Sequence, residues 1–445
     1  MKGAIAAGHP LTAAAGAAVL EAGGNAVDAC VAAGLTSWVC ESMLTGPGGG
    51  GFMLVHAGGT TRVLDFFVAV PRQVEPGAGE LLALAVDFDG DTQQVFHTGP
   101  AAVAVPGTAL GLQSAHARFG TLPWPELVAP ASALARDGVQ LTPAQGYLHR
   151  ILDGLLRHSP EGDAMYGGRV LVAGERLVVP DLASTLERIA REGAQVLYAG
   201  DIAHAIAAHV PISSVDLASY TVIEREPVVA SFRGSEFRSN PPPSSGGRLI
   251  ALGLESLGDD LDVVHAMRTM EAARVPAAGG TTHISVVDAH GDAASLSCSL
   301  GSGSGVVVPG TGIHLNNMLG EADLKGSARP GERLTSMMAP SVVMDGMRPR
   351  LVVGSAGSER LRGAILQVVA NVVGRGMGVE EAVDAPRVHV DDAGVVYAEP
   401  GLDGDVHFGR KNLFFGGVSA VELRADGGLA AAGDPRRGGA GMVVA

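Results

Sequence analysis

The sequence has few cysteines and few charged residues. Only Cys30, Cys40 and Cys298 occur among 445 residues, and this small, odd number argues against a disulfide framework and fits a reducing compartment. No spacing of Cys and His residues is typical of a metal site, so we expect neither a metal nor another cofactor. Charged residues make up 17% and hydrophobic residues 47%, which excludes a disordered or coiled-coil chain.

Basic residues are scarce too, and long apolar runs are missing. Lys and Arg number 31 against 46 Asp and Glu, so the net charge of −15 disfavours nucleic acid and anionic membranes as partners. No run approaches the roughly 18 apolar residues of a membrane span. Residues 1–5 begin like a signal peptide, but Gly8-His9-Pro10 interrupts the apolar run, so we expect a cytoplasmic protein.

Aromatic residues make up only 4%, whereas glycine accounts for 64 residues, so we expect a core of Ala, Val and Leu with close backbone contacts. Apolar periodicity and turn residues predict the elements. They are helices over 12–22, 26–38 (capped by Asn25), 182–192 (capped by Asp181) and 361–372, a helix-rich region over 100–215, strands over 52–55, 282–288 and 293–300, a hairpin of 341–344 with 350–354, and a solvated loop over 85–96. Hairpins flanked by helices indicate two stacked sheets with helices outside, an αββα sandwich of the α+β class.

Thr281 stands where a small, flexible segment, 272–280, meets a predicted strand. Threonine favours strands, so the Thr281-Thr282 pair taken alone is more often structural. Cleavage of the Gly280–Thr281 bond would change its chemistry. The freed α-amine, with a pKa near about 8, can take the proton from the hydroxyl of the same residue.

Motifs along nearly the whole chain resemble those of the gamma-glutamyltranspeptidase family. Each is weak alone, but together they are specific. They are Gly8-His9-Pro10-Leu11, Gly23-Gly24-Asn25-Ala26-Val27-Asp28-Ala29, Gly46-Pro47-Gly48-Gly49-Gly50-Gly51-Phe52-Met53, Val105-Pro106-Gly107-Thr108, Asn240-Pro241-Pro242-Pro243-Ser244-Ser245-Gly246-Gly247, Thr281-Thr282-His283, Gly312-Ile313-His314-Leu315-Asn316-Asn317 and Asp384-Ala385-Pro386-Arg387.

The resemblance implies a self-processing N-terminal-nucleophile hydrolase with the αββα fold. It places the cut between Gly280 and Thr281, so that a large fragment, 1–280, and a small fragment, 281–445, pair as a heterodimer within one domain. Thr281 matches the nucleophile, and Ser299 matches a second hydroxyl that hydrogen-bonds to it. Gly357 and Ser358 match the backbone donors of the oxyanion hole.

Other matches imply contacts with a small-molecule substrate. Glu321 matches an acid that binds the substrate α-ammonium, Thr335 and Ser336 match paired hydroxyls that contact its carboxylate, and Asn317 belongs to the same substrate-binding set. For Ser299, Glu321 and the 335–336 pair, the alternative interpretations are an ordinary strand serine, a solvated loop acid and a turn before a strand.

The departures from the family pattern concern substrate recognition. Phe67 stands in place of an Arg that grips the glutamyl α-carboxylate, Gly301 in place of an Asn, and Met318 in place of a Gln. A phenyl ring makes no bidentate contact, and losing one partner of a buried charge pair costs about 2–5 kcal/mol. Unless Arg72 or Arg360 compensates, we expect a more apolar site and a preferred substrate other than glutathione.

Three functions fit the sequence. The first is hydrolysis or transfer of an acyl group of a small molecule through Thr281. The second is cleavage of a C–C bond. Family homologues in the routes to lincomycin and pyrrolobenzodiazepine antibiotics look like hydrolases that remove an oxo-acid side chain from a tyrosine-derived pyrroline, on the way to a 4-alkylproline. The third is an uncut, non-catalytic binding protein, which the intact 279–283 run disfavours.

Overall fold

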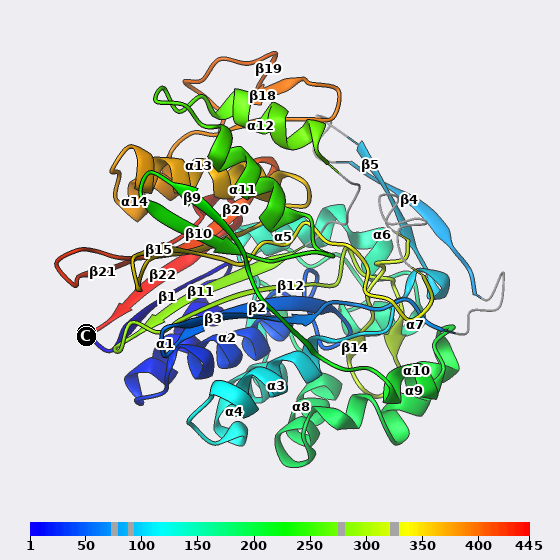
Figure 1. Cartoon of the computed structure of the whole chain (residues 1–445). Coiled ribbons are helices and arrows are strands. Elements are labelled where there is room, and N and C mark those ends of the chain that lie inside the picture. The colour runs from blue at the N-terminus through cyan, green and yellow to red at the C-terminus, as the bar shows by residue number, and fades with distance from the viewer. Residues whose placement is uncertain (73–78, 88–92, 275–280, 321–328) are drawn as a thin grey trace.

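Two antiparallel sheets stack face to face in the computed structural model, which describes residues 1–72, 79–87, 93–274, 281–320 and 329–445 (Figure 1). The larger sheet has seven strands in the order β22 (Ala440–Val444), β1 (Gly3–Ala7), β11 (Thr282–Asp288), β12 (Ala293–Ser299), β2 (Gly50–Ala57), β3 (Thr60–Phe66) and β8 (Ile223–Arg225). The smaller sheet has six strands in the order β21 (Leu429–Gly433), β20 (Gly417–Leu423), β16 (Arg348–Ala356), β15 (Ser341–Asp345), β10 (Ser235–Ser239) and β9 (Val228–Phe232).

Helices cover the outer face of each sheet (Figure 1). The larger sheet carries α1 (Pro10–Glu21), α2 (Ala26–Cys40), α3 (Thr108–Phe119), α4 (Trp124–Asp137) and α8 (Pro180–Glu192) on its side. The smaller sheet carries α11 (Gly246–Ser256), α12 (Val263–Ala272), α13 (Arg360–Val369) and α14 (Val379–Asp384). The protein is therefore an αββα sandwich of the α+β class, as predicted. Among the described helices, none is long and apolar enough to cross a membrane.

Shorter elements fill the connections. The helices are α5 (Pro143–Ile151), α6 (Asp153–Leu156), α7 (Pro160–Met165), α9 (Asp201–His209) and α10 (Ser214–Ala218). The strands pair as β4 (Leu82–Asp87) with β5 (Gln93–Thr98), β6 (Val139–Gln140) with β7 (Arg176–Leu177), β13 (Val307–Val308) with β14 (Ile313–His314), and β18 (Val396–Ala398) with both β17 (Val388–Val390) and β19 (Val406–His407).

Both sheets mix strands from before and after Thr281. In the larger sheet, β11 and β12 lie between β1 and β2, and in the smaller sheet β15 pairs with β10. Side chains from both parts of the chain also fill the layer between the sheets, where Phe52 and Val63 pack in one cluster with Val342 and Val352. The described residues on both sides of Thr281 thus contribute to the same sheets and to the same core cluster.

Local sequence signals predicted several elements correctly. Asn25 caps α2 and forms a capping box with Asp28, in which each side chain accepts a hydrogen bond from the other residue's backbone N–H. The expected hairpin is β11 with β12, and the second expected hairpin is β15 with β16. The cap and the turns are set by neighbouring residues, which explains why the sequence alone reveals them.

Two predictions were wrong. The expected solvated loop over 85–96 contains the ends of two paired strands, β4 and β5, because Val86 and Phe96 are buried on one side of the pair. Asp181 was expected to cap a helix, but α8 begins at Pro180 and Asp181 lies in its first turn, where its charge still favours the helix N-terminus. Most of the expected linker, 275–280, lies outside the described residues.

Candidate active site

Thr281 lies directly before β11, in the middle of the larger sheet. Its side chain is buried. Thr282 pairs with Cys298 of β12, and the same register continued by one residue places Thr281 opposite Ser299. The sheet therefore brings together the two hydroxyl residues that the sequence assigned to the nucleophile and its neighbour.

A small cavity of about 40 Å³ adjoins Thr281. Its walls come from parts of the chain that are far apart in sequence, including Gly8, Glu41, Ala356 and Arg437. Since one enclosed water needs roughly 10–15 Å³, the cavity accommodates a few waters or one small polar group.

Glu41 is a buried acid in this cavity that the sequence analysis did not single out. Its carboxylate accepts hydrogen bonds from Thr282 Oγ1 at 2.5 Å and from Thr12 Oγ1 at 3.0 Å. Burial raises the pKa of Glu41, although these hydrogen bonds and the charge of Arg437 act in the opposite direction. The available signal was an acid directly after α2, a mostly apolar helix that is buried along its whole length.

Gly357 and Ser358 form the turn between β16 and α13. Gly357 has a φ of +129°, and Ser358 has a φ of +53°, in the left-handed region that non-glycine residues adopt uncommonly. A Cβ on Gly357 would fall 2.7 Å from the Cα of Gly416, so only glycine fits there. The turn starts beside the cavity, because the preceding Ala356 lines it. The serine is tolerated, but in a conformation that costs of the order of 1 kcal/mol.

Phe67 and Met318 lie in the apolar layer between the two sheets. The Phe67 ring stacks on Phe52 at 5.4 Å, and Met318, Leu334 and Met338 belong to the same buried cluster. Neither Phe67 nor Met318 is among the described residues that line the Thr281 cavity. Position 67, which the resemblance aligns with the family's Arg, therefore lies in the apolar core of this chain.

Gly301 and Asn317 lie in the loops that follow β12 and β14. The Gly301 N–H donates to Ser299 Oγ at 2.8 Å. The Asn317 side-chain oxygen accepts from the Ser302 N–H at 3.0 Å, and its nitrogen donates to Ser302 Oγ at 2.8 Å and to the His97 carbonyl at 3.0 Å. The Asn317 amide therefore links the loop after β14 to the loop after β12 through hydrogen bonds.

Ser336 lies at the Pro-rich turn before α11. Its hydroxyl accepts from the Met338 N–H at 3.0 Å, and its carbonyl accepts from Ser244 Oγ and the Ser245 N–H, both at 2.8 Å. The adjacent Thr335 is half-buried. Glu321 and Gly280, also assigned from the sequence, lie outside the described residues.

The two arginines considered as replacements for the family Arg lie in different places. Arg72 lines a separate polar cavity of about 360 Å³, together with Arg225 and Arg333. The Arg360 guanidinium packs over the Phe414 ring, with 4.8 Å between its carbon and the ring centroid. Arg360 begins α13, two residues after Ser358.

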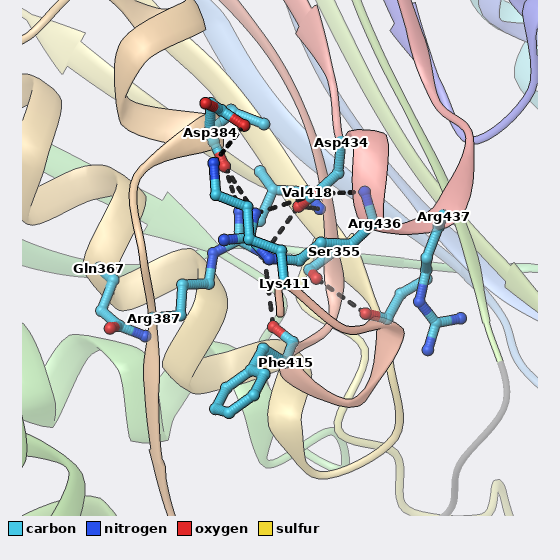
Figure 2. Close-up of polar contacts among 12 residues, drawn as sticks. Ser355, Gln367, Asp384, Arg387, Lys411, Phe415, Val418, Asp434, Arg436 and Arg437 are labelled. Carbon is cyan, nitrogen blue, oxygen red and sulfur yellow. Dashed lines mark hydrogen bonds and ion pairs between the residues drawn. The ribbon is translucent and has the colours of Figure 1, made fainter. Parts of the chain in front are cut away.

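An ion-pair network holds the C-terminal segment against the smaller sheet (Figure 2). Arg387, from the Asp-Ala-Pro-Arg motif, contacts Asp434 at 2.7 Å, and Asp434 also accepts from the Val418 N–H of β20 at 3.0 Å. Arg436 contacts both Asp434 and Glu399. Burial alone would raise the pKa of Asp434, but the charges of Arg387 and Arg436 outweigh burial and lower it. The network fixes the backbone from which Arg437 reaches the Thr281 cavity.

The comparisons with known proteins agree with this geometry. A sequence profile of gamma-glutamyltranspeptidase matches residues 12–275 and 259–444. The chain belongs to the gamma-glutamyltranspeptidase family. The acylase ACY 1 proenzyme of Pseudomonas sp. (strain SE83) is 32% identical, over 100% of this chain and 94% of that protein. The glutathione hydrolase proenzyme of Pseudomonas aeruginosa is 31% identical, over 99% of this chain and 94% of that protein.

Solved structures show the same fold. The crystal structure of cephalosporin acylase from Bacillus halodurans superposes with a TM-score of 0.85 at 24% identity, covering 99% of this chain and 95% of that one. Membership of the gamma-glutamyltranspeptidase family makes the chain a hydrolase or transferase of the N-terminal-nucleophile type. Within the described ranges, no group of three or more His, Cys, Asp or Glu side chains is placed to hold a metal ion.

Proposed function

We propose that this chain cuts itself before Thr281 and then uses Thr281 as the nucleophile of a hydrolase or acyltransferase that acts on an acyl bond of a small molecule. The observation that carries the proposal is the position of Thr281. It directly precedes a central strand, β11, whose register continued by one residue places it opposite Ser299, and it borders a small cavity. Both relatives named above are proenzymes, which agrees with a chain that is activated by cleavage.

The reaction needs only groups of this chain. In the cut form, the α-amine of Thr281 accepts the proton of its own hydroxyl while Oγ1 attacks the scissile carbonyl. The backbone N–H groups at Gly357 and Ser358 are our candidates to stabilise the oxyanion. The proton then passes to the leaving group, an ester to Thr281 remains, and water or an amine releases the acyl group.

Glutathione is not the substrate we expect. The family position for the carboxylate-binding Arg holds Phe67, whose ring is buried against Phe52. Buried at that position, a phenyl ring offers no donor to a substrate carboxylate. The acylases among the relatives and structural neighbours agree with a substrate other than a γ-glutamyl compound.

The second candidate, C–C bond hydrolysis, uses the same nucleophile. Thr281 attacks a ketone carbonyl, and the departing carbon leaves as an enamine-like or dienol-like anion. A phenyl ring in the site would suit an unsaturated substrate ring, but Phe67 is not among the described residues that line the Thr281 cavity. Acyl-bond cleavage is therefore our first choice. Turnover of a dihydropyrrole oxo-acid without turnover of any amide would reverse that order.

Cleavage is tested on a denaturing gel. We expect the purified wild-type chain of 45.0 kDa to give fragments of about 28 and 17 kDa, in proportion to their residue numbers. The Thr281→Ala variant is expected to stay whole and inactive, whereas the matched Thr281→Ser variant keeps a hydroxyl and is expected to be cut. A wild-type chain that stays whole but turns over acyl substrates contradicts the proposal, and an uncut chain without activity supports the non-catalytic binding protein.

A further inference from the structure

Two arginines, Arg437 and Arg360, lie near the Gly357-Ser358 turn. Arg437 lines the cavity together with Thr281 and Glu41. Its Nη2 lies 3.5 Å from the position that a Cβ would take on Gly357. Arg360 follows the same turn two residues later, and its charge acts on Arg437. Both cations are therefore close to the turn that we assign to the oxyanion hole.

The two guanidinium groups have weak partners among the described residues. Arg437 donates to the Leu413 carbonyl at 3.4 Å, and Arg360 lies 3.9 Å from the Glu359 carboxylate. The Nε of each is shielded from solvent and has no hydrogen-bond partner in the part of the chain that the structure describes. Buried N–H donors of this kind are almost always paired in native proteins.

The neighbouring arginines differ in their charge partners, although the Nε of Arg387 is also buried without a hydrogen-bond partner among the described residues. Arg387 and Arg436 are paired with carboxylates of Asp434 and Glu399. In Figure 2 the Arg437 side chain extends away from that network, with its guanidinium on the far side. Asp434 and Glu399 therefore pair with Arg387 and Arg436 and not with Arg437.

Burial and mutual repulsion disfavour the charged forms of Arg437 and Arg360, so a bound anion would stabilise them. Burial and the charge of Arg360 lower the pKa of Arg437 to about 10, although Asp434 and Glu41 act in the opposite direction. Burial also lowers the pKa of Arg360. Two acids line the cavity, Glu41 and Asp434. Asp434 is already paired with Arg387 and Arg436. The oxygens of Glu41 accept from Thr12 and Thr282, and burial disfavours its charged form.

The backbone around Arg437 is shaped for its side chain. A Cβ on Gly417, at the start of β20, would fall 2.4 Å from Cδ of Arg437, so the arginine stem needs a glycine there. On the other side, Gly357 leaves the guanidinium open toward the turn. The Asp434 network fixes the preceding residue, Arg436. The guanidinium is therefore held in place before any ligand arrives, which lowers the entropy cost of binding.

We propose that Arg437, with Arg360 beside it, binds a carboxylate of the substrate whose scissile carbonyl lies at Thr281. This inference rests on the proposed function and names its substrate class: acyl compounds with an anionic end. The site lies on the C-terminal side of the cavity, next to Gly357, and not at position 67. An arginine fork is the donor that best fits a carboxylate, and the cavity volume of about 40 Å³ suits a group of that size.

Anion binding is tested first by calorimetry on the processed protein, with glutarate as the probe and neutral glutaramide as its matched control. We expect glutarate to bind and glutaramide not to bind. Arg437→Gln and Arg360→Gln are expected to weaken glutarate binding by at least about tenfold, and Arg437→Lys by less, because a lysine keeps the charge but not the fork. Arg191→Gln, at an exposed arginine of α8, is the control that should bind like wild type.

Turnover supplies the second readout. Glutaryl-p-nitroanilide and valeryl-p-nitroanilide differ in a terminal carboxylate, and γ-glutamyl-p-nitroanilide adds an α-amine to the first. We expect wild type to prefer the glutaryl over the valeryl compound in kcat/KM. In Arg437→Gln we expect the ratio of the two kcat/KM values to fall at least about tenfold, mainly through a higher KM for the glutaryl compound. Thermal unfolding and the cleavage gel check that each variant folds and matures.

The outcomes separate this inference from the proposed function. Equal glutarate binding by wild type and Arg437→Gln, or no glutarate binding by wild type, overturns the carboxylate site. An unchanged glutaryl preference in Arg437→Gln overturns it too, even where Thr281 cleavage and valeryl turnover succeed. Failure of the Gly280–Thr281 cleavage overturns the proposed function, while glutarate binding is still measured on the uncut chain.

Discussion

Buried His283 is expected to make the free energy of unfolding fall at acidic pH. Its ring is buried between the sheets, with Nδ1 2.8 Å from Ser297 Oγ and Nε2 3.0 Å from Ser285 Oγ. A Cβ on Gly354 of the opposite sheet would fall 2.2 Å from the ring, so no water fits between them. Burial lowers the pKa of His283 from 6.5 to about 3, and the folded protein holds this imidazole neutral.

The magnitude follows from the two pKa values. In the unfolded chain His283 takes up a proton below about pH 6.5, whereas in the folded chain it does so only near pH 3. The stability is therefore complete above pH 6.5 and is lost as the pH falls toward 3. At pH 5 the loss is about 2 kcal/mol, from about 1.36 kcal/mol per pH unit over 1.5 units.

The assay is equilibrium urea unfolding of the Thr281→Ala chain at pH 7.5 and pH 5.0, with and without His283→Gln. The Thr281→Ala background keeps one chain, so that the free energy of unfolding is not complicated by fragment dissociation. Other buried histidines and carboxylates contribute equally to both proteins. We expect the chain with His283 to lose about 2 kcal/mol more on acidification than the His283→Gln chain. Equal losses in the two chains would refute the burial argument.

Three further substitutions test the core, the ion-pair network and the turn. Phe67→Arg places a cation in the apolar layer between the sheets, so we expect a loss of about 3 kcal/mol or more in the free energy of unfolding and no gain in γ-glutamyl-p-nitroanilide turnover. The matched Phe67→Leu variant is expected to cost about 1 kcal/mol. A stable, active Phe67→Arg enzyme would contradict the placement of the Phe67 ring in the core. Asp434→Asn leaves Arg387 buried without its carboxylate and is expected to lower the free energy of unfolding by about 3–5 kcal/mol. The control Asp426→Asn, at an exposed position, is expected to change it very little. Similar unfolding midpoints for the two variants would show that the network is not needed for stability. Ser358→Gly relieves a left-handed serine, so a melting experiment should show a stability gain of up to about 1 kcal/mol with turnover retained, and a loss of stability would argue against strain at that turn.

The parts of the fold that the sequence predicts are those set by neighbours along the chain. Asn25 and Asp28 form a cap within one helical turn, and the 282–300 hairpin closes over a few residues. The strands β4 and β5 were missed because Asp87, Asp89 and Asp91 dominated the sequence pattern. The alternation was present: Leu82, Leu84 and Val86 are more buried than the alanines between them.

The same distinction between local and long-range signals applies to the candidate site. Motifs that resemble the family predict roles for Thr281 and the Gly357 turn, since both are local signatures. Glu41 and Arg437 were not found, because they meet Thr281 only through contacts between α2, β11 and the C-terminal segment. For Phe67 the sequence gives the substitution, but whether its ring borders the cavity depends on packing against Phe52 and Met338.

The central claim is that one backbone cleavage turns an ordinary strand threonine into a nucleophile with its own base. Mass spectrometry with N-terminal sequencing of the catalytically active protein tests it most directly. We predict a small fragment that begins Thr281-Thr282-His283, with activity lost when its α-amine is chemically blocked. Full activity from a single uncut polypeptide, or from a fragment that begins at another residue, would contradict the claim.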